Sequence, residues 1–156
     1  MKIKDYFTPK SYIYTGEVKD MDTKIRNFHF NAQSVSETND FSCLTGHKQY
    51  IQVVGLSDVE KISMIKSHFE IEGLILEDIF NVRQRNKIES RPGYLFAVFH
   101  VSYLKEKSIK FDYMSMLLFK DTMITFHEKE PEYLEAVEHL IQTYPETKEK
   151  NIDFLF

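Results

Sequence analysis

The sequence is poor in several residue types, and each scarcity excludes a class of protein. Its only cysteine, Cys43, excludes a disulfide framework and a thiolate metal cluster. Five glycines leave little room for a glycine-rich loop that binds phosphate. No run approaches the roughly 18 consecutive apolar residues that cross a bilayer, and the first residues lack the apolar centre of a signal peptide. We therefore expect a soluble, cytoplasmic piece in which Cys43 is a small buried hydrophobe.

Basic residues are not in excess either. The chain has 20 lysines and arginines against 24 acidic residues, for a net charge of −4, which argues against a nucleic-acid partner. We find no G-x-S-x-G, no H-E-x-x-H and no nucleophile placed with a base, so we do not expect an enzyme. A length of 156 residues with 42% apolar content suits one globular domain, residues 1–156.

What the chain does contain is a series of strand patterns separated by short loops. The run from Tyr94 to Leu104 is apolar on both alternating faces, which predicts a strand with helices covering both sides. Short connections after it predict an antiparallel meander. The fold class is α/β, with a mixed sheet flanked by helices on both faces. The expected strands are Gln49 to Val54, Tyr94 to Tyr103, Ile109 to Phe119 and Met123 to His127, with weaker strand patterns at 11–15 and 28–32.

Helix signals fall between and after these strands. Ser57-Asp58-Val59-Glu60 has the spacing of a capping box. In this motif the Ser57 hydroxyl accepts a hydrogen bond from the backbone N–H of Glu60, and the Glu60 side chain reaches back to the backbone N–H of Ser57. A second short helix is expected over 74–82, and Pro131 opens a third with an apolar stripe.

The stretch "LILEDIFNVRQRNKIE" places two adjacent carboxylates inside the short apolar helix at 74–82. At 100° per residue the apolar side chains share one broad face, while Glu77, Asp78 and Asn81 share the other. Carboxylate and amide oxygens suit hard cations such as Mg²⁺ or Ca²⁺, and a divalent ion relieves the repulsion between two adjacent anions. Glu77 and Asp78 form half a metal site that another chain could complete; the alternative is a solvated helix face.

The same stretch carries a resemblance to a known family. "VVGLSD", "GLILEDIFNVRQRNKIE", "YLFAVFH" and "MSMLLFKDTMITFHEKEPEYLEAV" follow one another as in the cytoplasmic N-terminal domain of CorA-type magnesium/cobalt transporters. The similarity covers about two thirds of the chain, from Gln49 onward. Its most specific part is L-x-LEDI-x-N-x-x-QR-x-K-x-E, which includes Glu77 and Asp78. Asn86 stands where the family usually has proline, and the chain has no tryptophan.

The resemblance implies an α/β/α sandwich that serves as an ion-sensing, regulatory domain at the cytoplasmic face of the inner (plasma) membrane. In the family a long stalk helix joins this domain to two membrane helices, within a homopentamer. Glu77 and Asp78 occupy the family's acidic pair, which binds a regulatory divalent ion near a subunit boundary, with Asp78 the better candidate for direct contact. The ion expected is Mg²⁺, bound weakly by the isolated domain, with Co²⁺ or another divalent ion possible.

The Gly-Met-Asn pore signature and the membrane helices of that family are not in this sequence. We therefore expect a soluble domain of a longer transporter, ending near Phe156, that touches the membrane only through helices beyond it. Without them the chain is expected to be a monomer or weakly associated. Two alternatives stay open: the domain of a zinc- or cobalt-handling relative, and a free-standing module that binds a protein partner.

Overall fold

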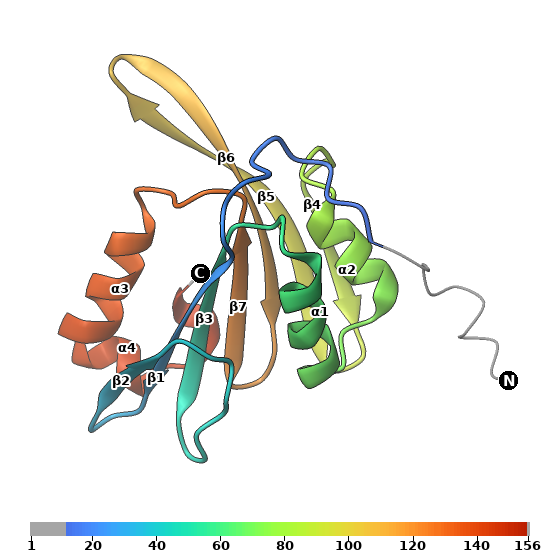
Figure 1. Ribbon diagram of the computed structural model, residues 1–156. Coiled ribbons are helices and arrows are strands. Elements are labelled where there is room, and N and C mark those ends of the chain that lie inside the picture. The colour runs from blue at the N-terminus through green and yellow to red at the C-terminus, as the bar shows by residue number, and fades with distance from the viewer. Residues whose placement is uncertain (1–11, 156) are drawn as a thin grey trace, which may run out of the picture.

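The computed structural model describes residues 12–155. Seven strands form one sheet in the order β2-β1-β3-β7-β6-β5-β4 (Figure 1). The β3–β7 pair is parallel and the other pairs are antiparallel, so the predicted mixed sheet is confirmed. The strands are β1 (Lys24–Phe30), β2 (Val35–Thr38), β3 (Lys48–Val54), β4 (Lys87–Arg91), β5 (Tyr94–Lys105), β6 (Ser108–Leu118) and β7 (Thr122–His127).

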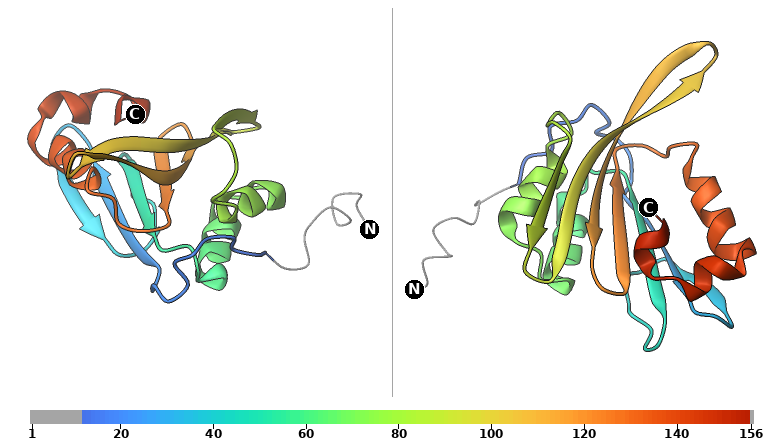
Figure 2. Two further views of the ribbon diagram at one scale, coloured as in Figure 1. Left: turned by 90° about the horizontal axis from the view of Figure 1, so that it is seen from above. Right: turned by 180° about the vertical axis from the view of Figure 1, so that it is seen from behind.

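Helices lie on both faces of this sheet, as the sequence predicts (Figure 2). The helices α1 (Val59–His68) and α2 (Gly73–Phe80) pack on one face. The helix α3 (Leu134–Thr143), the short α4 (Pro145–Glu149) and the 3-10 helix η2 (Ile152–Leu155) follow the last strand, and α3 and η2 pack on the other face. The predicted α/β/α arrangement is confirmed.

Two apolar clusters hold the layers together, one on each face. Ile51 and Val53 of β3 join the cluster under α1 and α2, whereas Tyr50 of the same strand joins the cluster under α3. The first half of β5 divides in the same way, with Phe96 on the α2 side and Ala97 on the other. Since successive side chains of a strand point to opposite faces, both clusters draw on the same strands.

The far halves of β5 and β6 do not meet the expectation of burial on both faces. The two strands pair with each other along their whole lengths, from Leu95↔Leu118 to Lys105↔Ser108. The outer partners are shorter: β4 pairs only as far as Val98, and β7 only with residues 114–118 of β6. Residues 101–111 therefore project beyond the sheet as a two-stranded hairpin, which we call the arm (Figure 1).

The first helix begins one residue later than a capping box at Ser57 requires. Asp58 is the N-cap, and its carboxylate accepts a hydrogen bond from the backbone N–H of Lys61 at 2.9 Å. The Ser57 hydroxyl is not available, because it donates to the carbonyl of Met21 at 2.9 Å. The predicted helix is correct, and its predicted cap is wrong.

Two further expectations from the sequence are not met. Cys43 is exposed rather than buried, because it lies in the loop between β2 and β3. Residues 12–15 form no strand; Tyr12 and Tyr14 instead pack against the cluster under α1 and α2. Residues 1–11 and 156 of the predicted domain lie outside the described part of the chain. Within that part, no helix is both long enough and apolar enough to cross a bilayer.

Candidate functional site

The helix α2 docks on the sheet through the apolar face that the sequence predicts. Ile75, Leu76, Ile79 and Phe80 are fully buried, and Val82 just after the helix is nearly so. Burying each such side chain contributes about 1.5–3 kcal/mol. This anchoring holds the opposite face of α2 at a fixed position on the surface, which is what a pair of ligands on that face requires.

The two carboxylates on the outer side of α2 have different surroundings. Glu77 is exposed and has no ion pair or hydrogen bond from its side chain to another described residue. Asp78 is half-buried and turned toward the sheet, where its Oδ2 accepts a hydrogen bond from the Lys87 Nζ at 2.6 Å. The two adjacent carboxylates thus point in different directions: Glu77 faces solvent, whereas Asp78 faces β4 and is paired with a cation.

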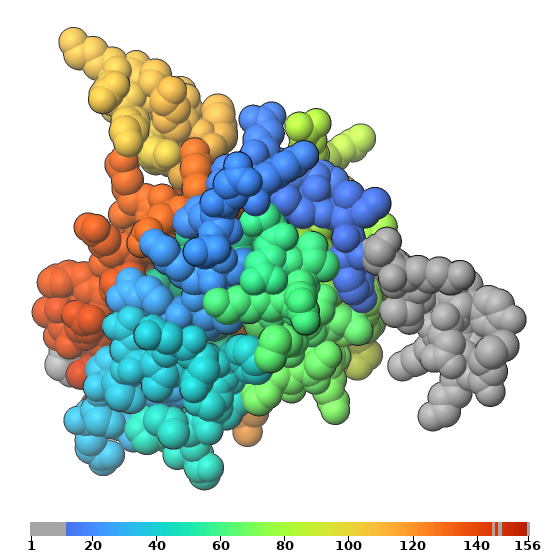
Figure 3. Space-filling view, in the orientation of Figure 1, coloured from blue at the N-terminus to red at the C-terminus, as the bar shows by residue number. Residues whose placement is uncertain are grey.

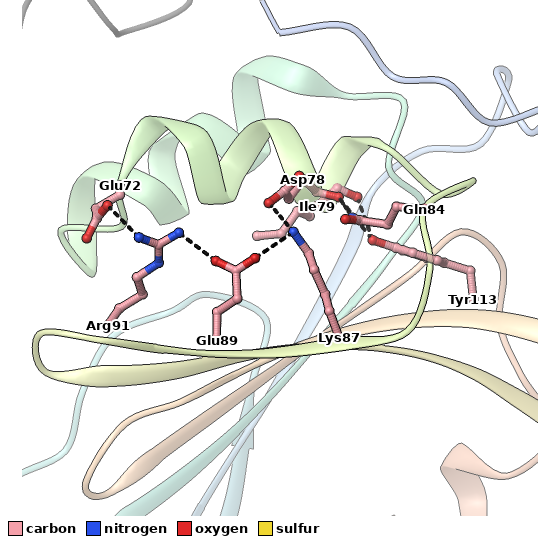
Figure 4. Close-up of polar contacts among 8 residues, drawn as sticks. All are labelled: Glu72, Asp78, Ile79, Gln84, Lys87, Glu89, Arg91 and Tyr113. Atoms are coloured by element: carbon pink, nitrogen blue, oxygen red, sulfur yellow. Dashed lines mark hydrogen bonds and ion pairs between the residues drawn. The ribbon is translucent and has the colours of Figure 1, made fainter.

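Lys87 belongs to a row of alternating charges that runs along β4 beneath α2 (Figure 4). Lys87, Glu89 and Arg91 are two residues apart on the strand, so their side chains share the face that looks at the helix. Lys87 lies 2.8 Å from Glu89, and Arg91 lies 2.5 Å from Glu89. Glu72, just before α2, completes the row at 3.8 Å from Arg91.

These ion pairs fix the charge of their members. Burial alone lowers the pKa of Lys87, but hydrogen bonds to Asp78 and Glu89 outweigh it and raise that pKa above its usual value. The hydrogen bond from Lys87 lowers the pKa of Glu89. Lys87 is therefore a permanent cation shared between two carboxylates, so it can leave Asp78 and still be paired.

The last turn of α2 is fixed by side chains that follow it. The Tyr113 hydroxyl donates to the carbonyls of Asp78 and Ile79 at 3.2 and 3.3 Å, and the Gln84 amide also donates to the Asp78 carbonyl (Figure 4). Asn81, which the sequence groups with the acidic pair, uses its side-chain oxygen elsewhere. That oxygen accepts from the Thr15 hydroxyl and from the backbone N–H of Arg83, each at 3.3 Å.

The donor set at α2 fits part of a magnesium site and not a whole one. Two carboxylates suit Mg²⁺, which keeps several waters when it binds to protein. Among residues 12–155, however, no three acidic, histidine or cysteine side chains gather closely enough to hold a metal ion. With Asn81 engaged and Asp78 paired, Glu77 is the one of these three side chains that has no partner in the described chain. The sequence alone could not show the Lys87 contact, because it depends on β4 passing beneath α2.

No model of a protein family matches the chain. It is 25% identical over 150 residues to the cobalt/magnesium transport protein CorA of Thermotoga maritima, an alignment that covers 91% of this chain and 43% of that protein. The chain thus spans less than half of the length of this relative.

Solved structures share the fold. The complete CorA magnesium transporter of Methanocaldococcus jannaschii superposes with a TM-score of 0.64 at 13% identity, over 86% of this chain and 42% of that one. The ZntB cytoplasmic domain of Vibrio parahaemolyticus superposes with a TM-score of 0.59 at 8% identity, over 78% of this chain and 50% of that one. The sequence similarity to a CorA protein confirms the resemblance, and the chain shares the fold of the soluble domain of CorA from Methanocaldococcus jannaschii.

Proposed function

We propose that this chain is the ion-sensing, regulatory domain of a CorA-like transporter of divalent cations, with Mg²⁺ as the ion sensed. Glu77 and Asp78 would supply two oxygen ligands, and a neighbouring subunit of a homopentamer would supply the rest. The proposal rests on the relationship to a protein named for cobalt and magnesium transport. The observation that carries it is an unpaired Glu77 beside Asp78, whose cation is shared with Glu89.

The shared lysine gives the proposed site a means of exchange. A divalent ion that approaches Asp78 must compete with Lys87 for the carboxylate. Lys87 lies 2.8 Å from Glu89 and so keeps an ion pair when Asp78 turns to the metal. The desolvation penalty of an unpaired ammonium is thereby avoided. Ion binding would then hold neighbouring subunits in a closed arrangement, and loss of the ion would restore the repulsion between carboxylates.

The decisive experiment is protection from proteolysis by Mg²⁺ in the full-length transporter. Wild type is compared with a variant that carries Glu77→Ala and Asp78→Ala. We expect Mg²⁺ to slow cleavage of the wild type and to have little effect on the variant. The matched control is Glu146→Ala with Glu149→Ala, which removes the same charge from the exposed positions of α4. Equal protection of wild type and the Glu77, Asp78 variant would mean that these carboxylates are only a solvated helix face.

The isolated chain provides a second measurement. Because it holds only part of a coordination sphere, we expect Mg²⁺ to bind in the millimolar range or more weakly, about 4 kcal/mol or less. Co²⁺ and Zn²⁺ are titrated alongside, since one relative is named for cobalt and another is a ZntB domain. Chemical shifts of α2 amides report the site directly.

A further inference from the structure

The arm, residues 101–111, presents an apolar face that nothing in the described chain covers. The cross-strand pairs Leu104↔Ile109 and Ser102↔Phe111 place Leu104, Ile109 and Phe111 on one side of the hairpin. These side chains are 74%, 67% and 64% exposed. Three large apolar side chains gathered on a projecting hairpin and rimmed by charge are typical of an interaction surface.

The other face of the arm is tied to the body of the molecule. Lys105 forms an ion pair with Glu132, and Lys129 lies 2.9 Å from Asp112 at the base of the arm. Both partners belong to the segment between β7 and α3. These contacts hold the arm by its polar side, so its apolar side stays open to a partner.

A shallow, open depression at the other end of the molecule has a mostly apolar lining. Its volume is about 590 Å³, and it lies along the outer face of α1 and the loop before β3. We call it the α1 groove; it is lined by Phe41, Glu60, Ser63, Met64, Ser67 and His68. Met64 is 56% exposed, and the rings of Phe41 and His68 lie 5.0 Å apart.

The arm cannot reach the α1 groove of its own chain. The arm projects from one end of the sheet, while α1 and the loop before β3 run to the opposite end (Figure 1). In the space-filling view the arm lies at the top of the molecule, apart from the atoms of α1 (Figure 3). Contact between these two surfaces therefore joins two molecules head to tail, which is the geometry of rings and filaments.

Charge favours the same pairing. The arm carries three lysines against one glutamate, and Lys107 at its tip forms no ion pair with any described residue. Glu60 at the groove is exposed and likewise unpaired within that part of the chain. The whole chain has a net charge of −4, so a basic arm is attracted to another copy, whereas an acidic body is repelled by an anionic membrane.

We propose that the arm of one molecule docks its Leu104, Ile109 and Phe111 face into the α1 groove of a second copy of this chain. Three side chains cover much less than the 1,200–2,000 Å² or so of a stable interface, so a single contact is weak. In an assembly that holds the copies together, effective concentration makes such a contact count. The contact uses neither Glu77 nor Asp78 and is independent of the metal site proposed above.

Self-association is measured by sedimentation velocity from about 10 µM to about 1 mM in EDTA, a range that spans weak contacts. We expect the wild type to associate at the upper end, and Phe111→Ser or Met64→Ser to weaken association about tenfold or more. The matched control is Ile88→Ser, because Ile88 is 64% exposed but lies on β4, away from the arm. A wild type that stays monomeric throughout, or arm variants that associate like the wild type, would overturn the proposal.

A charge-reversal pair tests which surfaces meet. Lys107→Glu and Glu60→Lys each place like charges at the proposed contact and should weaken association. The double variant restores opposite charges and should recover it, since coupling between contacting residues is not additive. Failure of the double variant to recover would exclude contact between the arm and the α1 groove.

The single cysteine offers a covalent test. The Cys43 Sγ lies 3.9 Å from the Nε2 of His68, a residue of the α1 groove, and Cys43 is exposed. Ile109→Cys should give a ladder of disulfide-linked oligomers under mild oxidation, and adding Cys43→Ser should remove the rungs above dimer. Ile88→Cys is the control. Equal ladders from Ile109→Cys and Ile88→Cys would contradict the proposal. Binding to phosphatidylglycerol vesicles through the arm, without self-association, would contradict it as well. Because EDTA is present, these outcomes leave the proposed magnesium function untouched.

Discussion

The Lys87 Nζ lies 2.6 Å from the Asp78 Oδ2 and 2.8 Å from the Glu89 Oε1, so a single cation bridges α2 and β4 at the candidate metal site. This contact sets both the stability of the helix position and the availability of Asp78. A metal ion and Lys87 cannot share the same oxygen at full strength. A metal ion that binds Asp78 must therefore displace Lys87 from the carboxylate, and this competition weakens metal binding.

Lys87→Met should strengthen Mg²⁺ binding to the isolated chain several-fold, because Asp78 loses its competing cation. The same change should lower the free energy of unfolding by about 1 kcal/mol, the scale of a partly exposed ion pair. Amide shifts of α2 during Mg²⁺ titration measure the first effect, and urea unfolding measures the second. Arg85→Met is the control, since it removes the same charge from an exposed position. Unchanged Mg²⁺ affinity in Lys87→Met would mean that Asp78 is not a ligand.

Which side chains of α2 are buried and which are exposed could be predicted from the sequence, because helical periodicity is a local property. It placed Ile75, Ile79 and Phe80 inside and Glu77 outside, as the structure has them. The contact between Asp78 and Lys87 was beyond its reach, since it depends on how β4 crosses the helix. The arm shows a second limit. Alternating apolar residues predicted a strand, but they could not show that β4 and β7 end before it does.

The N-cap of α1 is Asp58 rather than Ser57, because the Ser57 hydroxyl is bonded to the carbonyl of Met21. Asp58→Ala should lower the free energy of unfolding by about 1 kcal/mol, which is a fall in melting temperature of about 2–4 °C for a chain of this size. Glu60→Ala should have almost no effect, because Glu60 makes no capping contact. Thermal unfolding at low protein concentration measures both. A larger effect at Glu60 would support the capping box instead.

The turn at the tip of the arm is strained. It is a two-residue loop in which Glu106 and Lys107 have positive φ of 49° and 65°, where asparagine and glycine are preferred. Glu106→Asn with Lys107→Gly should stabilise the hairpin by about 1 kcal/mol. Because the arm can open without global unfolding, hydrogen exchange of its amides is the measurement. Slower exchange confined to the arm is expected; unchanged exchange would show that the turn is not strained.

The burial of His127 should make the free energy of unfolding depend on pH. Its side chain is 1% exposed on β7, and neither ring nitrogen has a hydrogen-bond partner in the described chain. Burial lowers the pKa of His127 to about 3, and the nearby Asp112 carboxylate only partly opposes this. The unfolded chain binds a proton near the usual pKa of about 6.5, so it binds more protons than the folded chain below that pH.

The contribution of His127 is therefore fully present above about pH 6.5 and is lost as pH falls toward 3, with a slope approaching 1.4 kcal/mol or so per pH unit. Urea unfolding between about pH 7 and pH 5 covers this effect, because most carboxylates titrate lower. Burial also lowers the pKa of His29, so the His127→Leu variant is needed to separate the two histidines. His127→Leu should flatten the slope over this range whatever its effect on stability at pH 7. His139→Leu, at an exposed position on α3, is the matched control. If His127→Leu keeps the wild-type slope, the folded and unfolded chains must bind the same number of protons at His127 over this range, and burial would not be lowering its pKa.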